Sequence, residues 1–285
     1  MHFCAEDVLD EFYKYDKDLP LNASESESLS APDAASKEFH VTFDSARDQR
    51  VCSLLTLPEQ ALPPYPAVII LHGVFGHKSS PNQLKRSAHL VRAGYATLRI
   101  DAQYCGERQI PFINGASIHP RYYYRNRDAM IQTALDLMRA VDYLATRQDV
   151  DMRKVGFAGF SMGGAVGAIF SSYEERIKAV VLGITGGDFS KWKVSAPDGR
   201  ALERMLQAYH LVDPIHYVRK ISPRRLLMQN ARNDIIISRD AAEALFNAAL
   251  DPKQIIWYDC GHADMPDESL EDMRRFFDEC LRPNT

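Results

Sequence analysis

The sequence predicts an α/β fold: a mostly parallel central sheet with helices on both faces and a small lid insertion. Short, almost continuous apolar runs, such as residues 67–71 and 177–183, alternate with longer segments of helical periodicity. Strands this apolar are buried on both faces, which is typical of a parallel sheet covered by helices on each side. The chain has 285 residues, a length that suits one such domain with a large core.

Residues 1–37 are predicted to precede the main domain, which spans residues 38–285. Residues 1–18 can form a short amphipathic helix, and residues 22–36, rich in Ser, Glu and Ala, read as a linker or loop. The helix would cover either a surface of its own domain or a partner subunit. We favour the first of these two alternatives.

The main domain is predicted to open with an antiparallel hairpin of strands 39–45 and 51–57, after which strands and helices alternate. Ligands of such sheets bind beyond the carboxyl ends of the strands, so functional residues are sought in the loops that follow strands. The expected strands are 67–71, 95–100, 154–158, 177–183, 225–230 and 254–258, and the expected helices are about 80–93, 126–147, 162–172, 239–249 and 268–281.

Two long connections interrupt this alternation. Residues 101–120 form a long loop, and residues from about 186 to 214, which hold one helix at 199–210, are the predicted lid. Long loops in compact domains are often lids or binding loops, so we expect these two to roof a pocket. Local packing or a solvated salt bridge is the alternative for each of their candidate substrate contacts, which are Tyr104, Glu107, Arg108, Trp192 and Met205.

A candidate nucleophile lies in the run Gly159-Phe160-Ser161-Met162-Gly163, between a predicted strand and a predicted helix. A serine at the apex of such a sharp turn presents its hydroxyl above the sheet, and the flanking glycines let strand and helix pass closely. The motif alone is weak evidence for a nucleophile, but here it lies between a predicted strand and a predicted helix, as the motif requires. The alternative is a glycine-rich turn with a capping serine.

A serine hydroxyl becomes a nucleophile when a base lies within hydrogen-bond reach and an acid orients that base. Asp234 and His262 each come just past a predicted strand, so both lie at the same edge of the sheet as Ser161. Taken singly, Asp234 could be a turn or cap residue and His262 a surface histidine. Together the three predict a catalytic triad in the chain order Ser, Asp, His. Asp259 and Asp264 are alternatives for the acid, but they lie very close to His262 in sequence.

Acyl transfer also needs two backbone N–H groups that stabilise the negative charge on the carbonyl oxygen. One is expected from Met162, directly after the nucleophile. The other is expected from Val74 in the loop after strand 67–71, with Phe75 as the alternative. Phe75 is also a candidate for substrate contact. His72 is expected to shape this loop rather than to act as a second base.

These motifs resemble the α/β-hydrolase superfamily over about residues 40–282. Within it the chain looks most similar to the dienelactone hydrolase-like and acetyl xylan esterase-like serine esterases, with some likeness to the catalytic domains of prolyl oligopeptidase-type peptidases. The resemblance implies the α/β-hydrolase fold and serine hydrolase chemistry. A dienelactone hydrolase proper has a cysteine nucleophile where this chain has Ser161. The likeness rests on the motifs above and on residues 122–125, 128–144, 149–156, 213–215 and 222–224.

Composition excludes several classes of partner. A net charge of −4 and the lack of a dense basic stripe argue against nucleic acid. Five cysteines, an odd number without metal-binding spacing, fit a reducing compartment. The first ten residues lack the pattern of a signal peptide, and no apolar run approaches the length of a membrane-spanning helix. We expect a soluble cytoplasmic protein with no metal or organic cofactor, and a homo-oligomer stays open.

The predicted function is a serine hydrolase that cleaves carboxylic esters with short acyl groups through an acyl-enzyme. A peptidase or amidase would use the same residues but would also need a site for the peptide. A thioesterase would need a basic patch for coenzyme A, for which Arg121, Arg125 and Arg127 are the only hint. A non-catalytic binding protein of the same fold is the third alternative, and the intact set of triad residues argues against it.

Overall fold

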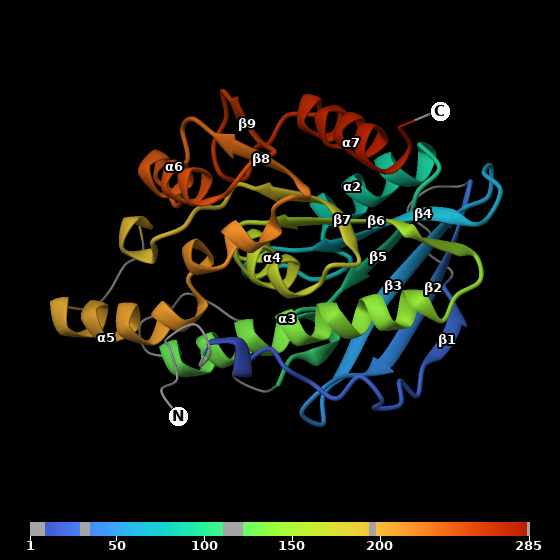
Figure 1. Cartoon of the computed structure of the whole chain (residues 1–285), viewed down its shortest axis with the longest axis horizontal. Coiled ribbons are helices and arrows are strands. Elements are labelled where there is room, and N and C mark those ends of the chain that lie inside the picture. Colours follow the sequence, from blue (N-terminus) through green and yellow to red (C-terminus); the bar gives the residue numbers. More distant parts are fainter. Residues whose placement is uncertain (1–8, 29–34, 111–121, 194–197, 284–285) are drawn as a thin grey trace.

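The computed structural model describes residues 9–28, 35–110, 122–193 and 198–283. Its nine strands form one sheet in the order β1-β2-β3-β5-β4-β6-β7-β8-β9 (Figure 1). The pairs β1–β2, β2–β3 and β3–β5 are antiparallel, and all the others are parallel. The mostly parallel sheet is thereby confirmed. The strands are β1 (Ser24–Glu27), β2 (Ser36–Asp44), β3 (Arg50–Pro58), β4 (Tyr65–Leu71), β5 (Ala96–Ile100), β6 (Val150–Phe160), β7 (Ile177–Gly183), β8 (Arg225–Ala231) and β9 (Lys253–Tyr258).

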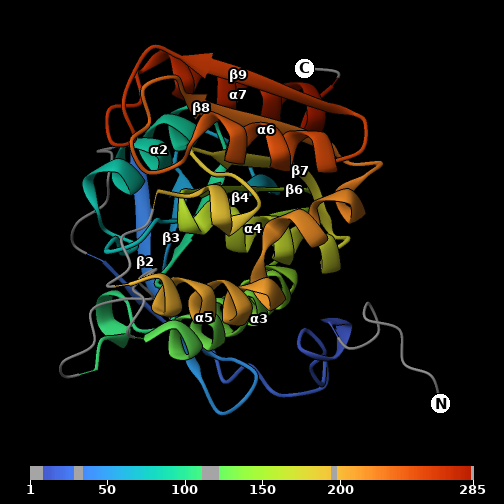
Figure 2. The same cartoon turned by 90° about the vertical axis from the view of Figure 1, so that its left-hand side faces the viewer.

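Helices cover both faces of the sheet, as predicted (Figures 1 and 2). On β4, Ile69 and Leu71 face one core, while Val68 and Ile70 face the other, because successive side chains of a strand point to opposite faces. The first core is shared with α3 (Tyr123–Ala145), α4 (Met162–Tyr173) and α6 (Arg239–Ala248), and the second with α2 (Pro81–Arg92) and α7 (Glu268–Leu281). Helix α5 (Gly199–Tyr209) lies outside α3.

The linker predicted at residues 22–36 is wrong at residues 24–27, where β1 forms an edge strand of the sheet and pairs with β2. All four residues of β1 are exposed, so its Ser-Glu-Ser-Glu sequence carries no alternating apolar pattern. What holds it is backbone pairing together with Glu25, which accepts hydrogen bonds from Tyr143 (2.7 Å) in the last turn of α3 and from Arg147 (2.8 Å) just after that helix. Such long-range polar contacts leave no signature in a short window of sequence.

The N-terminal segment packs on its own domain. Residues 1–8 of the predicted helix lie outside the described residues, and residues 9–11 are helical. Tyr13 is buried, with its ring 4.9 Å from that of Tyr173 and 5.6 Å from that of Tyr217. The first of the two predicted alternatives is therefore the one seen. In the described ranges, no helix combines the length and the apolar character needed to cross a bilayer.

Candidate active site

Ser161 occupies a sharp turn between β6 and α4. Its backbone has φ 57° and ψ −121°, a conformation that a non-glycine residue adopts at a cost and that surrounding packing must enforce. The packing is close on both sides. A Cβ on Gly159 would lie 2.2 Å from the carbonyl oxygen of Gly163, and one on Gly163 would lie 2.4 Å from that of His72. Both glycines are needed for α4 to approach the sheet, so the elbow expected from the sequence is present.

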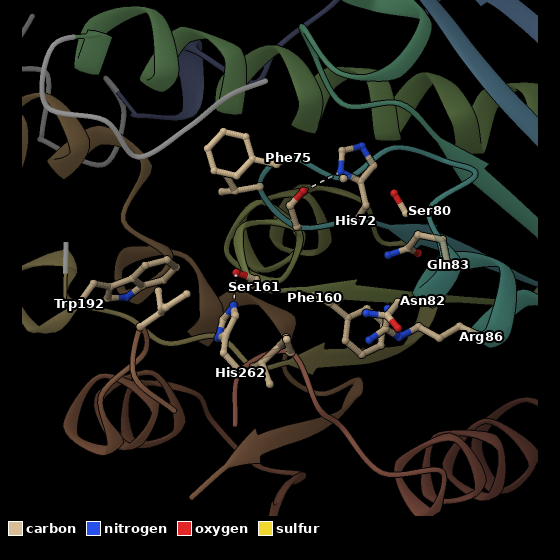
Figure 3. Close-up of a pocket in the computed structure, with 16 residues that line it drawn as sticks. His72, Phe75, Ser80, Asn82, Gln83, Arg86, Phe160, Ser161, Trp192 and His262 are labelled. Carbon is tan, nitrogen blue, oxygen red and sulfur yellow. Dashed lines mark hydrogen bonds between the residues drawn. The ribbon is translucent and has the colours of Figure 1, made fainter. Parts of the chain in front are cut away.

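Three side chains from three strand ends form one hydrogen-bonded chain. His262 Nε2 lies 3.0 Å from Ser161 Oγ (Figure 3), and His262 Nδ1 lies 2.7 Å from Asp234 Oδ2. The second oxygen of Asp234 accepts the backbone N–H groups of Ile236 and Ile237, both at 2.8 Å. Both oxygens of Asp234 thus accept hydrogen bonds and fix the carboxylate, as expected of the acid that orients a catalytic histidine.

The alternative acid Asp259 is placed elsewhere. Asp259 forms an exposed ion pair with Arg232 at 3.0 Å. The carboxylate hydrogen-bonded to the His262 ring is that of Asp234.

The loop after β4 lies directly against the nucleophile. A Cβ on Gly73 would lie 3.1 Å from the Cβ and 3.6 Å from the Oγ of Ser161. The carbonyl of Gly73 accepts the N–H of Gly76 at 3.1 Å, which closes a tight turn around Val74 and Phe75. Phe75 adopts φ 60° in this turn, and 72% of its surface is exposed. A strained, exposed aromatic residue beside a nucleophile is typical of a functional loop.

Met162 and Val74 are the two residues expected to supply oxyanion donors. As the first residue of α4, Met162 has no intrahelical acceptor for its N–H. Val74 is the first residue inside the turn that closes over Ser161. The arrangement can therefore offer one N–H from each side to an oxygen held above Ser161.

A cavity of about 390 Å³ opens over Ser161 and His262. Figure 3 shows Trp192 on one side of these residues, and Asn82 and Arg86 on the other. One end of the cavity is apolar and the opposite end is polar. Its walls are formed by His72, Gly73, Val74, Phe75, Gly76, Ser80, Asn82, Gln83, Arg86, Phe160, Ser161, Ile184, Trp192, Ile236, His262 and Ala263.

A sequence profile of the dienelactone hydrolase family matches residues 51–269. The chain belongs to the dienelactone hydrolase family. This membership makes it a hydrolase that acts on ester bonds. No curated protein matches the sequence of this chain significantly.

Solved structures share the fold at low identity. An acetyl xylan esterase from a Paenibacillus species superposes with a TM-score of 0.77 at 22% identity, covering 96% of this chain and 93% of that one. A second, from a Thermoanaerobacterium species, gives 0.75 at 20% identity with the same coverage. The protein Est1E from Butyrivibrio proteoclasticus gives 0.62 at 18% identity, covering 84% of this chain and 97% of that one.

Four of the side chains predicted to contact substrate in this hydrolase are absent from the described cavity wall. Glu107 pairs instead with Lys78 and, at 2.9 Å, with His40. Arg108 donates a 2.6 Å hydrogen bond to Asp136 of α3, and its side chain is only 6% exposed. Met205 is fully buried where α5 packs on α3. Tyr104 packs against the same core. Met205 belongs to the apolar face of α5. This face packs on α3 and therefore does not reach the cavity.

The lid expectation therefore holds only in part. Of the described residues from 186 to 214, Trp192 alone lines the cavity. Its backbone bridges to Ile237 in the loop that carries Asp234. Phe75, the other retained candidate, also lines the cavity, on the side of Ser161 opposite His262 (Figure 3). Residues 111–120 of the second predicted roof segment lie outside the described residues.

The polar end of the cavity was missed by the sequence reasoning. Arg86 and Gln83 belong to the inner face of α2, three residues apart, and both are buried. The signal was present: positions 83, 86, 87 and 90 share one helix face, and three of these four residues are polar. Polar residues on a face that packs on a sheet indicate a site.

His72 shapes the loop, as expected. Its Nε2 accepts the N–H of Ala102 at 3.1 Å, and its Nδ1 lies 2.7 Å from the carbonyl oxygen of Gly73. These partners assign the proton to Nδ1. Burial lowers the pKa of His72, which keeps the ring neutral and preserves Nε2 as an acceptor.

The other end of the loop, at Lys78, is anchored to Asp101, the residue that directly precedes Ala102. Asp101, fully buried after β5, accepts the Lys78 N–H at 2.8 Å and the Lys78 ammonium at 2.5 Å. Arg99 donates to the Lys78 carbonyl at 2.9 Å. Since Ala102 holds His72 and Asp101 holds Lys78, the turn beside Ser161 is fixed at both ends by consecutive residues.

Replacing Asp101 with asparagine is expected to lower the free energy of unfolding by about 2 kcal/mol. The buried Lys78 ammonium would lose one of its two carboxylate partners and keep Glu107. Urea denaturation measures the change. The matched control is Glu243→Gln, which breaks the exposed Arg239–Glu243 pair and should change stability by less than about 0.5 kcal/mol. Equal effects of the two substitutions would contradict the anchoring role.

Proposed function

We propose that this hydrolase is a serine esterase that cleaves small carboxylic esters with short acyl groups, using Ser161, His262 and Asp234 as its catalytic triad. The observation that carries the proposal is the unbroken hydrogen-bond chain from Asp234 through His262 to Ser161, with distances of 2.7 and 3.0 Å. Free thiols at the described cysteines Cys52, Cys260 and Cys280 support a cytoplasmic setting.

In the proposed reaction, His262 takes the proton of Ser161 as Oγ attacks the ester carbonyl. Asp234 holds the ring in the required tautomer and stabilises its charged form. The N–H groups of Met162 and Val74 bind the oxygen that becomes negative. His262 then protonates the departing alcohol, and water releases the acid from Ser161 by the same steps in reverse.

The size of the cavity supports a preference for short acyl groups. Its volume of about 390 Å³ lies near the lower end of the range for small-molecule sites, about 300–1,000 Å³. The indole of Trp192 and the ring of Phe75 stand at its apolar end. The likeness to two acetyl xylan esterases in fold agrees with a small acyl group.

Hydrolysis of p-nitrophenyl esters from acetate to palmitate tests the proposal. We expect kcat/KM to be highest for acetate to butyrate and to fall for longer chains, because the cavity cannot bury them. A fluorophosphonate probe should label the protein at Ser161. A marked preference for long chains would contradict the acyl assignment.

Comparison of these esters with amide and thioester substrates separates the alternative functions. Turnover of aminoacyl amides or of acyl-coenzyme A exceeding that of the matched esters would favour a peptidase or a thioesterase. Absence of turnover together with absence of fluorophosphonate labelling would favour a binding protein.

A further inference from the structure

The buried face of α7 is polar at the end that follows the loop of His262. Ser269 and Asp272, among the first five residues of the helix, are both buried. The buried residues farther along the helix are apolar: Met273, Phe276, Phe277 and Leu281. Strand β8, on which α7 packs (Figure 1), contributes Gln229, which is 1% exposed. Buried amides and carboxylates are costly unless they are hydrogen-bonded, so this cluster needs partners.

A network of hydrogen bonds joins this end of α7 to Tyr258, the last residue of β9. The phenol of Tyr258 donates to Asp272 Oδ2 at 2.7 Å. Gln229 Nε2 donates to the phenol oxygen of Tyr258 at 2.9 Å and to the carbonyl oxygen of Ser269 at 2.8 Å. Burial and the bond to Asp272 raise the pKa of Tyr258, so the phenol keeps its proton. The network thus links two strands and a helix in the interior, where hydrogen bonds are strong and fix geometry.

The loop of His262 connects the two elements that this network joins. It spans residues 259–267, between Tyr258 and the first residue of α7. From Gly261 to Met265, the described backbone makes one backbone–backbone hydrogen bond, a long one of 3.4 Å from the N–H of Asp264 to the carbonyl of Gly261. A loop with so few bonds of its own is positioned by its two ends, and both ends belong to the network.

Tyr258 also contacts the chain that leads to Asp234. Its carbonyl accepts the N–H of Arg232 at 2.9 Å, and the carbonyl of Cys260 accepts the N–H of Asn233 at 3.1 Å. Arg232 and Asn233 directly precede Asp234. A shift of Tyr258 would therefore move the loop of the base relative to the loop of the acid.

We propose that Tyr258 is a positioning residue for His262, and that its phenol, held between Gln229 and Asp272, fixes both ends of the loop that carries this base. The inference rests on the proposed esterase function. Proton transfer by His262 depends on the 3.0 Å contact between its Nε2 and Ser161 Oγ, and a displacement of about 1 Å can lower a rate by about a hundredfold.

The substitution Tyr258→Phe tests the proposal, because it removes the phenol oxygen and keeps the ring. We expect kcat for p-nitrophenyl acetate to fall about tenfold or more. KM should change little, because Tyr258 does not line the cavity. Fluorophosphonate labelling of Ser161 should slow together with kcat, because the attack of Ser161 Oγ needs the same base.

The matched control is Tyr95→Phe. Tyr95 is also buried, and its phenol donates to Asp278 of α7 at 2.8 Å and accepts from Arg282 at 3.1 Å. Because Tyr95 directly precedes β5, it lies at the edge of the sheet opposite the strand ends that carry the triad. The two variants should lower the urea midpoint by similar amounts, while Tyr95→Phe leaves kcat unchanged. Unchanged kcat in Tyr258→Phe, or equal losses of kcat in both variants, would overturn the proposal.

A second pair of variants tests the same contact from α7. Asp272→Asn keeps an oxygen that can accept the phenol of Tyr258 and should keep most of kcat, whereas Asp272→Ala should match Tyr258→Phe. Equal losses in the two Asp272 variants would show that this hydrogen bond does not position the base, and would overturn the proposal.

The proposal and the esterase function fail in different ways. If the unmodified protein does not hydrolyse p-nitrophenyl acetate, the esterase function is rejected. Amide hydrogen exchange then still tests the positioning role: Tyr258→Phe should speed exchange at the N–H groups of Arg232 and Asn233, and Tyr95→Phe should not. Exchange at these two groups that is unchanged by Tyr258→Phe would overturn the proposal.

Discussion

Replacing Ser161 with alanine is expected to lower kcat for p-nitrophenyl acetate by about 10⁴-fold or more, with KM changed little. Alanine removes the oxygen that attacks the ester and leaves the backbone of the elbow and the donors of Met162 and Val74 in place. Some hydrolysis above the rate in water should therefore persist. Steady-state kinetics, with fluorophosphonate labelling as a second readout, measures the effect.

Two further variants show whether Ser161 acts together with His262. The double substitution Ser161→Ala with His262→Ala should be no slower than Ser161→Ala alone, because residues that act as a unit lose their effect together. The control Ser190→Ala removes an exposed hydroxyl that bonds to Asp188 and should leave kcat unchanged. Activity of Ser161→Ala above about one hundredth of the original would indicate a different nucleophile and reject the triad.

The candidate site was predictable because its parts are local in sequence and are combined by a simple rule of topology. Each of Ser161, Asp234 and His262 follows an apolar strand within a few residues, and a parallel sheet brings such positions to one edge. The strands before Asp234 and His262, β8 and β9, are direct neighbours, and only β7 separates β8 from β6, the strand before Ser161. Only the order of the strands had to be supplied by the fold.

What escaped prediction depends on tertiary contacts between polar groups. Strand β1 is held by Glu25 contacts to residues about 120 positions away. Arg108 looks like a solvent-facing cation in sequence, yet it pairs with Asp136 on α3. Arg86 looks like an ordinary helix-surface residue until its ring contact with Phe160 is seen. In each case the partner is remote in sequence, so the hydrophobic periodicity of a local segment gives no indication of the contact.

Replacing Gly163 with alanine is expected to lower the free energy of unfolding by about 3 kcal/mol or more. The added Cβ would lie 2.4 Å from the carbonyl oxygen of His72 and 2.7 Å from that of Leu71. Both oxygens belong to backbone at the end of β4, which pairs with strands on both sides, so the clash cannot be relieved by a side-chain rotation. Helix α4 would have to move away from the strand.

That movement should also lower kcat by about 10²-fold, since it separates Ser161 from the loop holding Val74, and a displacement of about 1 Å can have this effect. Urea unfolding and ester kinetics measure the two consequences together. The matched control is Gly199→Ala in α5, where no atom lies within 4 Å of the added Cβ; it should be neutral or stabilise by up to about 1 kcal/mol. A stable, fully active Gly163→Ala protein would mean that α4 can shift without disturbing Ser161, and the close approach of helix and strand would then not be what positions the nucleophile.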